Sequence, residues 1–415
     1  MTDTLPDFSA RTPALARRHR AEARFRRLGL GAIVLALGFL AVMLGTIGWL
    51  GAGAFQKTLV RLDVPLEQSA FEGGGIGTAN YGRLTKTALR ARFPEVSKRR
   101  DKKALYRLLS SDAPRELRRR VAEQPSLVGG TLPVWLSASG DLDQYVKHGV
   151  TGRLKGKSVA WIETLRDSGD IRTAFNAGFF LSGDSRRPEL AGIASALAGT
   201  AWTLAVCFGL SFPVGILAAI YLEEFSRRGR WSEFIEVNIN NLAAVPSIVF
   251  GLLGLAVFLN LMHLPRSSPL VGGMVLALMT LPTIIIASRA ALRAVPPTIR
   301  EAALGIGATR VQTVFHHVAP LALPGMLTGA IVGMARALGE TAPLLMIGMV
   351  AFIVDIPGSI LEPATALPVQ IFLWADSAER GFLEKTAAAI IVLVVVLVLM
   401  NLAAIVLRAR FRRRF

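Results

Sequence analysis

The chain has little sulfur and comparatively little negative charge. Cys207 is the only cysteine among 415 residues, so neither a disulfide nor a cysteine-based metal site can form within the chain. Asp and Glu number 29 against 47 Lys and Arg, which gives a formal net charge of +18. The basic residues flank long apolar runs instead of forming a soluble basic face, and this pattern argues against nucleic acid as a partner.

The sequence also lacks a nucleotide-binding motif. The segment from Gly152 to Ser158 ends in Gly-Lys-Ser like a phosphate-binding loop, but three residues separate its glycines where the motif requires four. We interpret Lys157 and Ser158 as the start of a solvated helix. We therefore expect no catalytic residue, no metal site and no cofactor in this chain.

Apolar residues dominate instead. They make up 52% of the chain, and the mean hydropathy is +0.47, which is too high for an ordinary soluble domain. A bilayer core of about 30 Å is crossed by about 20 apolar residues in a helix. We predict an all-α membrane protein with six spans, at Leu28–Leu50, Gly199–Leu222, Leu242–Met262, Leu270–Ser288, Met326–Ile353 and Ala387–Leu407.

Basic residues indicate the orientation of these spans. Arginines crowd the leader 1–27, the tail 408–415 and the loops after the second and fourth spans, whereas acids exceed bases between the fifth and sixth. Because Lys and Arg favour the cytoplasmic side, we expect both termini in the cytoplasm. The segment 28–50 lacks a small-residue cleavage site and is interpreted as a retained anchor.

The polar segment 51–189 is long enough to form a domain. We predict an α+β insertion on the periplasmic side. Strands are expected at Thr58–Val64 and Thr131–Ser137, and helices at Tyr81–Arg92, Lys102–Leu109, Pro114–Glu123 and Lys157–Asp167. Asp112 can cap the helix at Pro114, and Gly73, Gly74, Gly75 and Gly77 predict a loop. The apolar core would then be 190–407.

The polar loop 293–323 lies between the fourth and fifth spans. A short helix of small residues is followed by Gly307, which suits a turn, and by a second helix with Val311, Val314, Phe315 and Val318 on one face. A helix lying in the lipid interface is the alternative, but it requires neither Gly307 nor Pro320. We expect this loop to contact a partner.

Span five carries an ionisable pair, Arg336 and Glu340, one helical turn apart. Arg336 would lie about 15 Å from the inner end of the predicted span, near the middle of the bilayer. It should therefore face protein or a watery path. Gly329, Gly333 and Gly339 would allow close helix packing, and Pro343 would interrupt the helix.

Two sets of motifs point to a known family. Glu301-Ala-Ala, then three residues and Gly307, with Pro320 further on, resembles the cytoplasmic loop of ABC importer permeases; His317 and Ala319 depart from the pattern. The runs 336–345, 240–251 and 365–374 are similar to phosphate importer permeases, the A-type subunit of the Pst system. The resemblance covers 199–407 and leaves out the insertion.

The resemblance implies a six-span type I importer for phosphate in the inner membrane of a bacterium, with a permease core at 190–407. Its partners would be a second homologous permease, a dimer of ATP-binding subunits that hold ATP and Mg, a periplasmic phosphate-binding protein and the lipid bilayer. The expected ATPase-docking residues are Arg300, Glu301, Ala302, Ala303, Gly307, Ala308, Phe315 and Pro320. The expected substrate pathway comprises Arg336, Glu340, Thr341 and Ser247.

Alternatives to this function remain open on the sequence alone. The substrate could be sulfate, molybdate, a polyamine or another small solute. The chain could also be a membrane-anchored sensor that presents the outer domain, and Arg336 with Glu340 could be a structural cross-link instead of a path.

Overall fold

The computed structural model describes residues 13–71, 75–227 and 229–411, and it divides into two units, Met1–Leu50 and Gly51–Phe415. In the first unit, α1 (Pro13–Ala52) contains the whole predicted anchor, and its apolar side chains, such as Val34 and Phe39, are exposed. Arg11, Gly73, Gly74 and the arginines of the tail at 412–414 lie outside the described residues.

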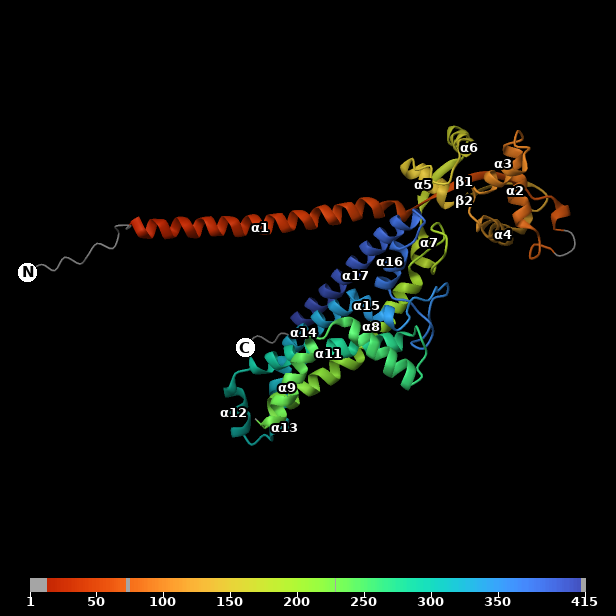
Figure 1. Cartoon of the computed structure of the whole chain (residues 1–415). Helices are drawn as coiled ribbons and strands as arrows, with labels where there is room; N and C mark the ends of the chain where they lie inside the picture. The colour runs from red at the N-terminus through yellow and green to blue at the C-terminus, as the bar shows by residue number, and fades with distance from the viewer. Residues whose placement is uncertain (1–12, 72–74, 228, 412–415) are drawn as a thin grey trace, which may run out of the picture. The chain divides into compact units, whose positions relative to one another are not determined.

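In the second unit, residues 51–189 form a lobe built on a three-stranded antiparallel sheet in the order β2-β1-β3 (Figure 1). The strands are β1 (Gln56–Pro65), β2 (Thr131–Ser137) and β3 (Ile171–Phe175). The central strand β1 buries Val60, Leu62 and Val64 at alternate positions, which is the period expected of a strand with one face on the core.

Six helices complete the lobe: α2 (Tyr81–Arg92), α3 (Arg99–Tyr106), α4 (Ala113–Glu123), α5 (Gly140–His148), α6 (Gly156–Asp167) and α7 (Ala177–Leu181). The predictions for α2, α4 and α6 match closely, whereas the helix predicted at Lys102–Leu109 begins and ends earlier. Asp112 occupies the N-cap position of α4, but its side chain makes no capping hydrogen bond. The Glu116 carboxylate instead accepts from the Ser137 amide at 2.8 Å.

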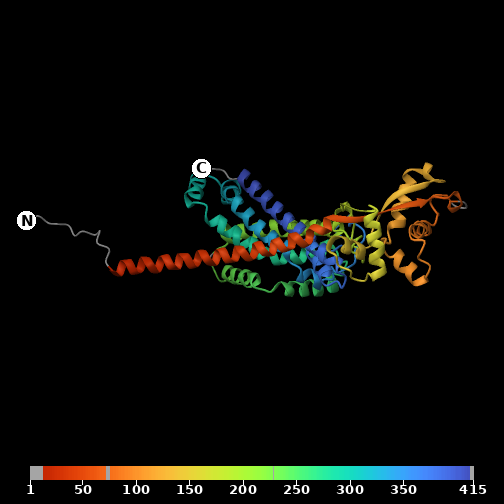
Figure 2. The same cartoon turned by 90° about the horizontal axis from the view of Figure 1, so that it is seen from above.

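Four long helices form the membrane bundle: α8 (Ala194–Ile220), α11 (Pro269–Arg293), α14 (Ala319–Gly339) and α17 (Gly381–Phe411). Helix α11 lies between α8 and α14, and α17 packs on α14 (Figures 1 and 2). Small residues allow the close approach, because a Cβ on Gly273 would stand 2.5 Å from the Val206 side chain. Within the described residues, five helices including α1 are long and apolar enough to cross a membrane.

The third predicted span, Leu242–Met262, is wrong as a single straight helix. The chain forms α9 (Arg230–Ala243), breaks, and continues as α10 (Ser247–Leu253) and the π-helical η5 (Gly254–Leu261), with a bend of 104° between the two parts. Pro246 explains the break, because proline has no amide donor and disfavours helical geometry in the residue before it. Counted as one span, the bent pair would be the sixth.

The fifth predicted span, Met326–Ile353, is also wrong at its end. Helix α14 stops at Gly339, Glu340 adopts an extended conformation, and the five-residue α15 (Ala342–Met346) follows with Pro343 in its first turn. The chain from 350 to 366 has no helix or strand before α16 (Leu367–Ala375) begins. Proline therefore interrupts the span as predicted, but it does so earlier than expected.

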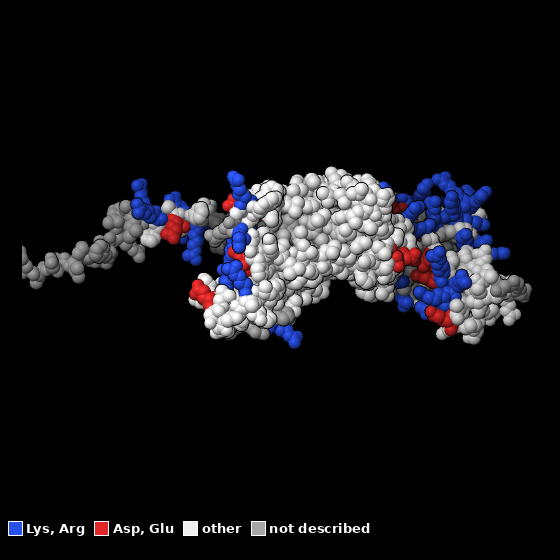
Figure 3. Space-filling model, turned by 90° about the horizontal axis from the view of Figure 1, so that it is seen from below, with Lys and Arg blue, Asp and Glu red and all other residues white. Residues whose placement is uncertain are grey.

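Charge is distributed in keeping with a membrane protein. A broad band of the bundle shows almost no Lys, Arg, Asp or Glu on the face in Figure 3, and charged side chains gather at its ends and on the lobe. The segment 51–189 holds 24 Lys and Arg against 15 Asp and Glu. The lobe is thus a basic domain attached to an apolar bundle.

Candidate functional site

The loop between α11 and α14 is a helical turn of the predicted kind. Helix α12 (Pro297–Gly305) ends before Gly307, whose φ of +90° is a left-handed conformation that favours glycine. Helix α13 (Arg310–Gln312) then starts with a capping box in which Thr309 and Gln312 satisfy each other's amides. Local sequence signals therefore fix both the turn and the restart.

The tip of this loop exposes apolar side chains. Leu304, Ile306, Val311 and Phe315 are exposed, with Ile306 at 83%. Large apolar groups clustered on a protein surface often mark an interaction site. We call these four residues the loop tip.

The predicted apolar face of the second helix is only partly correct. Val314 and Val318 are buried against α8 and α11, whereas Val311 and Phe315 are exposed. Residues Thr313–Val318 form the π-helical η6, which has a wider period than an α-helix, so positions chosen at α-helical spacing divide between two faces.

Most of the expected docking residues lie around the tip. Glu301, Ala302, Gly307 and Phe315 are exposed, and Ala308 and Pro320 are partly buried. Ala303 is buried, so it packs inside the loop. The structure therefore gathers the motif on one loop but leaves only part of it accessible.

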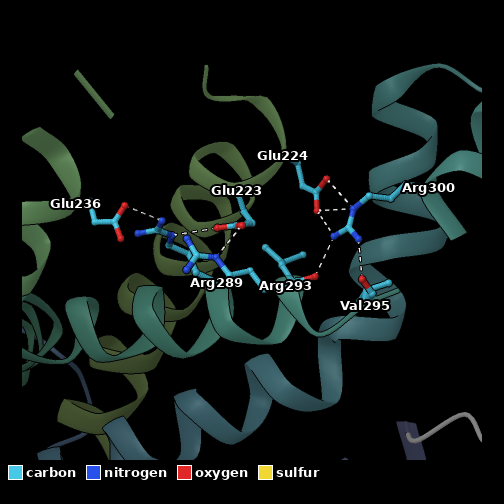
Figure 4. A network of polar contacts seen from close by, with 8 residues as sticks. Glu223, Glu224, Glu236, Arg289, Arg293, Val295 and Arg300 are labelled. Atoms are coloured by element: carbon cyan, nitrogen blue, oxygen red, sulfur yellow. Dashed lines mark hydrogen bonds and ion pairs between the residues drawn. The ribbon is translucent and has the colours of Figure 1, made fainter. Parts of the chain in front are cut away.

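Arg300 makes its contacts within the chain. Its guanidinium donates to the Glu224 carboxylate, with Nη2 to Oε1 at 2.6 Å, and to the carbonyl oxygens of Leu292 and Val295 (Figure 4). Five donors in a planar fork allow one arginine to bridge several acceptors. Arg300 thus ties α12 to the end of α8 and to the end of α11.

Two further arginines on α11 extend this arrangement. Arg289 lies 2.9 Å from Glu236 of α9 and 3.4 Å from Glu223, and Arg293 lies 2.8 Å from Glu223 (Figure 4). Glu223 and Glu224 belong to the π-helical η4 (Tyr221–Phe225) that ends α8. We call these four side chains, together with Arg300 and Glu224, the ionic brace.

The sequence reasoning missed the acidic half of the ionic brace. The signal was the pair Glu223-Glu224 directly after the predicted second span, on the side otherwise populated by arginines. Such acids need partners, and three arginines at the end of α11 and the start of α12 supply them.

The expected pathway residues lie at the two helix breaks. Ser247 begins α10 after Pro246, while Glu340 and Thr341 occupy the break between α14 and α15. The short helices α10 and α15 pack closely, since a Cβ on Gly251 would stand 2.7 Å from Pro343 Cα. The two interruptions are thus joined by direct contact of the segments that follow them.

Arg336 and Glu340 form the predicted pair, with Nε and Oε1 3.6 Å apart. Arg336 lies in the last turn of α14 and not in the middle of the helix, because the helix begins earlier and ends earlier than predicted. Its side chain is 49% exposed in the single chain. The guanidinium is therefore accessible beside a helix break.

The three glycines of span five behave differently from one another. A Cβ on Gly329 would stand 2.2 Å from the Ala287 methyl group, and one on Gly333 would make an ordinary 3.6 Å contact. No neighbour lies within 4 Å of such a Cβ on Gly339, so close packing there is not observed. Gly339 instead ends the helix.

No group of three or more His, Cys, Asp or Glu that could hold a metal ion occurs among residues 13–71, 75–227 and 229–411. His316 and His317 are exposed on the loop between α11 and α14. The chemistry offered at the helix breaks is thus that of guanidinium, carboxylate and hydroxyl groups, and the loop tip at the other end of α14 is a separate apolar surface.

Two known families match parts of the chain. Residues 211–415 match the family described as binding-protein-dependent transport system inner membrane component, and residues 12–155 match a domain of unknown function, DUF3333. The chain is 34% identical to the phosphate transport system permease protein PstA 1 of Mycobacterium tuberculosis over 225 residues, covering 54% of this chain and 71% of that protein.

A second relative is the phosphate transport system permease protein PstA of Yersinia pestis, at 30% identity over 53% of this chain and 73% of that protein. Among solved structures, the MetNI methionine ABC transporter aligns with a TM-score of 0.42 and 19% identity, over 54% of this chain and 95% of that chain. The chain belongs to the PstA-type family of ABC transporter permeases, multi-pass proteins of the inner membrane that are not themselves enzymes.

Proposed function

We propose that the chain is one half of the membrane-spanning part of an ATP-driven importer for inorganic phosphate. Its family supports this assignment, since two relatives are phosphate transport permeases. The single structural observation that carries it is the exposed loop tip held by the ionic brace, a surface placed where a nucleotide-driven partner could move the bundle.

In this proposal the bent pair α9 and α10 with η5 counts as a sixth span. Both termini and the loop tip lie on the cytoplasmic side, and the lobe lies on the opposite side. A second permease completes the path, a dimer of ATP-binding subunits holds ATP and Mg and docks on the loop tip, and a periplasmic binding protein delivers the anion. This chain then needs no cofactor of its own.

Force would pass from the loop tip to the helices through the ionic brace. Arg300 connects α12 to Glu224, and Arg289 and Arg293 connect α11 to the end of α8 and to α9. These pairs are partly buried, with Glu224 only 10% exposed, so they hold geometry better than fully solvated ion pairs. A push on α12 is thereby shared by three helices.

The substrate pathway is proposed to follow the helix breaks. Arg336 offers a planar fork that matches phosphate oxygens, and Glu340 at 3.6 Å competes for the same guanidinium, which keeps the anion from being held too tightly. Thr341 and Ser247 supply hydroxyl groups at the two breaks.

Reconstituted transport tests the function. The chain would be co-expressed with its ATP-binding and second permease subunits, purified, and placed in proteoliposomes with the binding protein. We expect ATP-dependent uptake of radiolabelled phosphate that sulfate and molybdate in excess do not suppress. Failure of the ATP-binding subunit to co-purify would remove the importer assignment, and equal suppression by sulfate would change the substrate.

Docking is tested by one charge placed on the tip. Ile306→Asp should abolish co-purification with the ATP-binding subunit, because a carboxylate would be buried against an apolar partner surface. Ile356→Asp is the matched control, since Ile356 is also exposed but lies in the segment 350–366. Equal association by both variants would remove the tip from the interface.

Charge reversal distinguishes a substrate-pathway role of Arg336 from a structural cross-link with Glu340. We expect Arg336→Gln and Glu340→Gln to reach the membrane at normal abundance and to transport poorly. The double variant Arg336→Glu with Glu340→Arg keeps an ion pair but exchanges the charges. Restored transport in that variant would indicate a structural cross-link and contradict the pathway role.

A further inference from the structure

A large cavity lies between the lobe and the segments that precede α8 and α17. Its volume is about 1300 Å³. Its walls come from α2, the segment after α3, the start of α4, both ends of α5, and the residues around Arg187 and Arg380. The proposed transport path does not use this cavity.

Basic side chains outnumber acidic ones on the cavity wall. The bases are Lys86, Arg107, Arg153, Arg187 and Arg380, and the acids are Asp141, Glu189 and Glu379. One acid is already occupied, since Arg153 Nη1 lies 3.3 Å from Glu379 Oε1. The remaining walls therefore carry a clear positive excess.

Glu189 is a partly buried acid of the cavity wall. Burial raises the pKa of its carboxyl, although the charge of Arg187 and the hydrogen bond that it accepts from Ser110 Oγ at 3.3 Å act in the opposite direction.

Three arginines of the cavity wall are not tied into the fold by close polar contacts. Arg107, Arg187 and Arg380 make no side-chain hydrogen bond or ion pair with any residue in the described parts of the chain, although the charge of Arg187 acts on Glu189. Exposed arginines commonly pair with nearby acids when the fold offers them, and here three are left with all their donors available. They come from three separate segments, so a ligand bridging them would join the lobe to the bundle.

The other lining groups also suit an anionic ligand. Thr85, Ser111 and Thr151 also line this space, and the loop there contains Gly149 and Gly152, both with positive φ. The volume exceeds that of a usual small-molecule pocket, about 300–1,000 Å³, so a single small ion would contact only part of the wall. The ligand should therefore carry several anionic groups.

We propose that this cavity binds a small soluble polyanion, a molecule with two or more phosphate or carboxylate groups bridged by Arg107, Arg187 and Arg380. Arginine recognises both kinds of group through paired N–H donors. Pyrophosphate and citrate are the probes for the two chemistries.

Binding is measured by calorimetric titration of the full chain in nanodiscs of phosphatidylcholine, whose headgroups carry no net charge. We expect saturable binding of pyrophosphate, citrate or both, and weaker binding of inorganic phosphate. The triple variant R107Q/R187Q/R380Q should lose at least about tenfold in affinity, since each lost charged hydrogen bond contributes substantially.

A matched variant controls for net charge. R83Q/R119Q/R120Q removes the same charge from exposed positions of α2 and α4 that do not line the cavity, and it should bind as the wild type does. No saturable binding of either probe by the wild type, or an equal loss in both variants, would overturn the proposal. Because this test needs neither ATP nor transport, its failure is independent of the importer assignment.

Discussion

Gly329 of α14 and Ala287 of α11 are in such close contact that a Cβ at position 329 would stand 2.2 Å from the Ala287 methyl carbon. We predict that Gly329→Ala separates the two helices and destabilises the bundle by about 1–3 kcal/mol. Thermal unfolding in detergent measures this change. Gly209→Ala in α8 is the control and should be close to neutral, because a Cβ added at this position would have no neighbour within 4 Å.

A compensating change sharpens this first prediction. Ala287→Gly removes the opposing methyl group, so the double variant with Gly329→Ala should recover most of the lost stability. A Gly329→Ala protein as stable as the wild type would show that the two helices are not packed as described.

The lobe is fastened to α17 by buried charges. Lys147 of α5 lies 2.6 Å from Asp143 and 3.6 Å from Glu384, and its ammonium also donates to the carbonyl oxygens of Gly53 and Gln56. The side chain of Glu384 is only 7% exposed, and its carboxylate also pairs with His148. Removing one partner from a buried ion pair costs about 3–5 kcal/mol, so Glu384→Gln should loosen α5 strongly.

Hydrogen exchange of α5 amides measures that loosening. Glu379→Gln is the control, because Glu379 is 37% exposed and its partner Arg153 is 69% exposed, so this pair should contribute only about 0–1 kcal/mol. Equal exchange rates in the two variants would mean that the cluster does not fasten the lobe.

Asp184 predicts a dependence of stability on pH. Burial raises the pKa of its carboxyl above the usual 3.8, although Trp374 Nε1 donates to it at 2.9 Å. The folded state therefore holds this proton more tightly than the unfolded state. Ionising Asp184 therefore costs more free energy in the folded state than in the unfolded state. The protein loses stability as the pH rises from the unfolded pKa to the folded pKa, and the loss is complete above both values.

The matching variant is Asp184→Asn, which keeps an oxygen to accept from Trp374 but cannot ionise. We expect the melting temperature of the variant relative to wild type to increase as the pH rises from about 4 through the folded pKa. Asp376→Asn, at an exposed aspartate, controls for lost charge. A difference that does not change with pH would contradict the assignment.

Arg300 is predicted to position the docking loop instead of touching the partner. Arg300→Ala and Glu224→Ala should each weaken ATPase association, and the double variant should lose little more than either single one, because both remove the same contact. Association is measured by titrating the ATP-binding subunit. Additive losses would indicate that Arg300 contacts the partner directly.

Local signals allowed much of the fold to be predicted. Pro114 in the first turn of α4, Gly307 at the loop turn and the alternating residues of β1 each determine structure within a few neighbours. Helix α5 could have been found in the same way, since Ser139 caps it and Gly149, with φ of +68°, ends it.

Features that depend on distant contacts could not be predicted. Strand β3 is short and exists through its pairing with β1, more than a hundred residues earlier in the sequence. His148 and Glu384 are 236 residues apart, and no periodicity connects them. The broken third span was misjudged because apolar composition gives length but not direction, and Pro246 turns the chain by 104° inside the apolar run.

The charged residues at the start of α17 make the lobe hard to discard in evolution. Glu384 and Lys385 are each about 5% exposed because α5 and the Phe179 ring cover them. A descendant that deleted the lobe would uncover both at once, so relatives without it should carry neither ion at these two aligned positions. The residues at these two aligned positions would then distinguish relatives with the lobe from relatives without it.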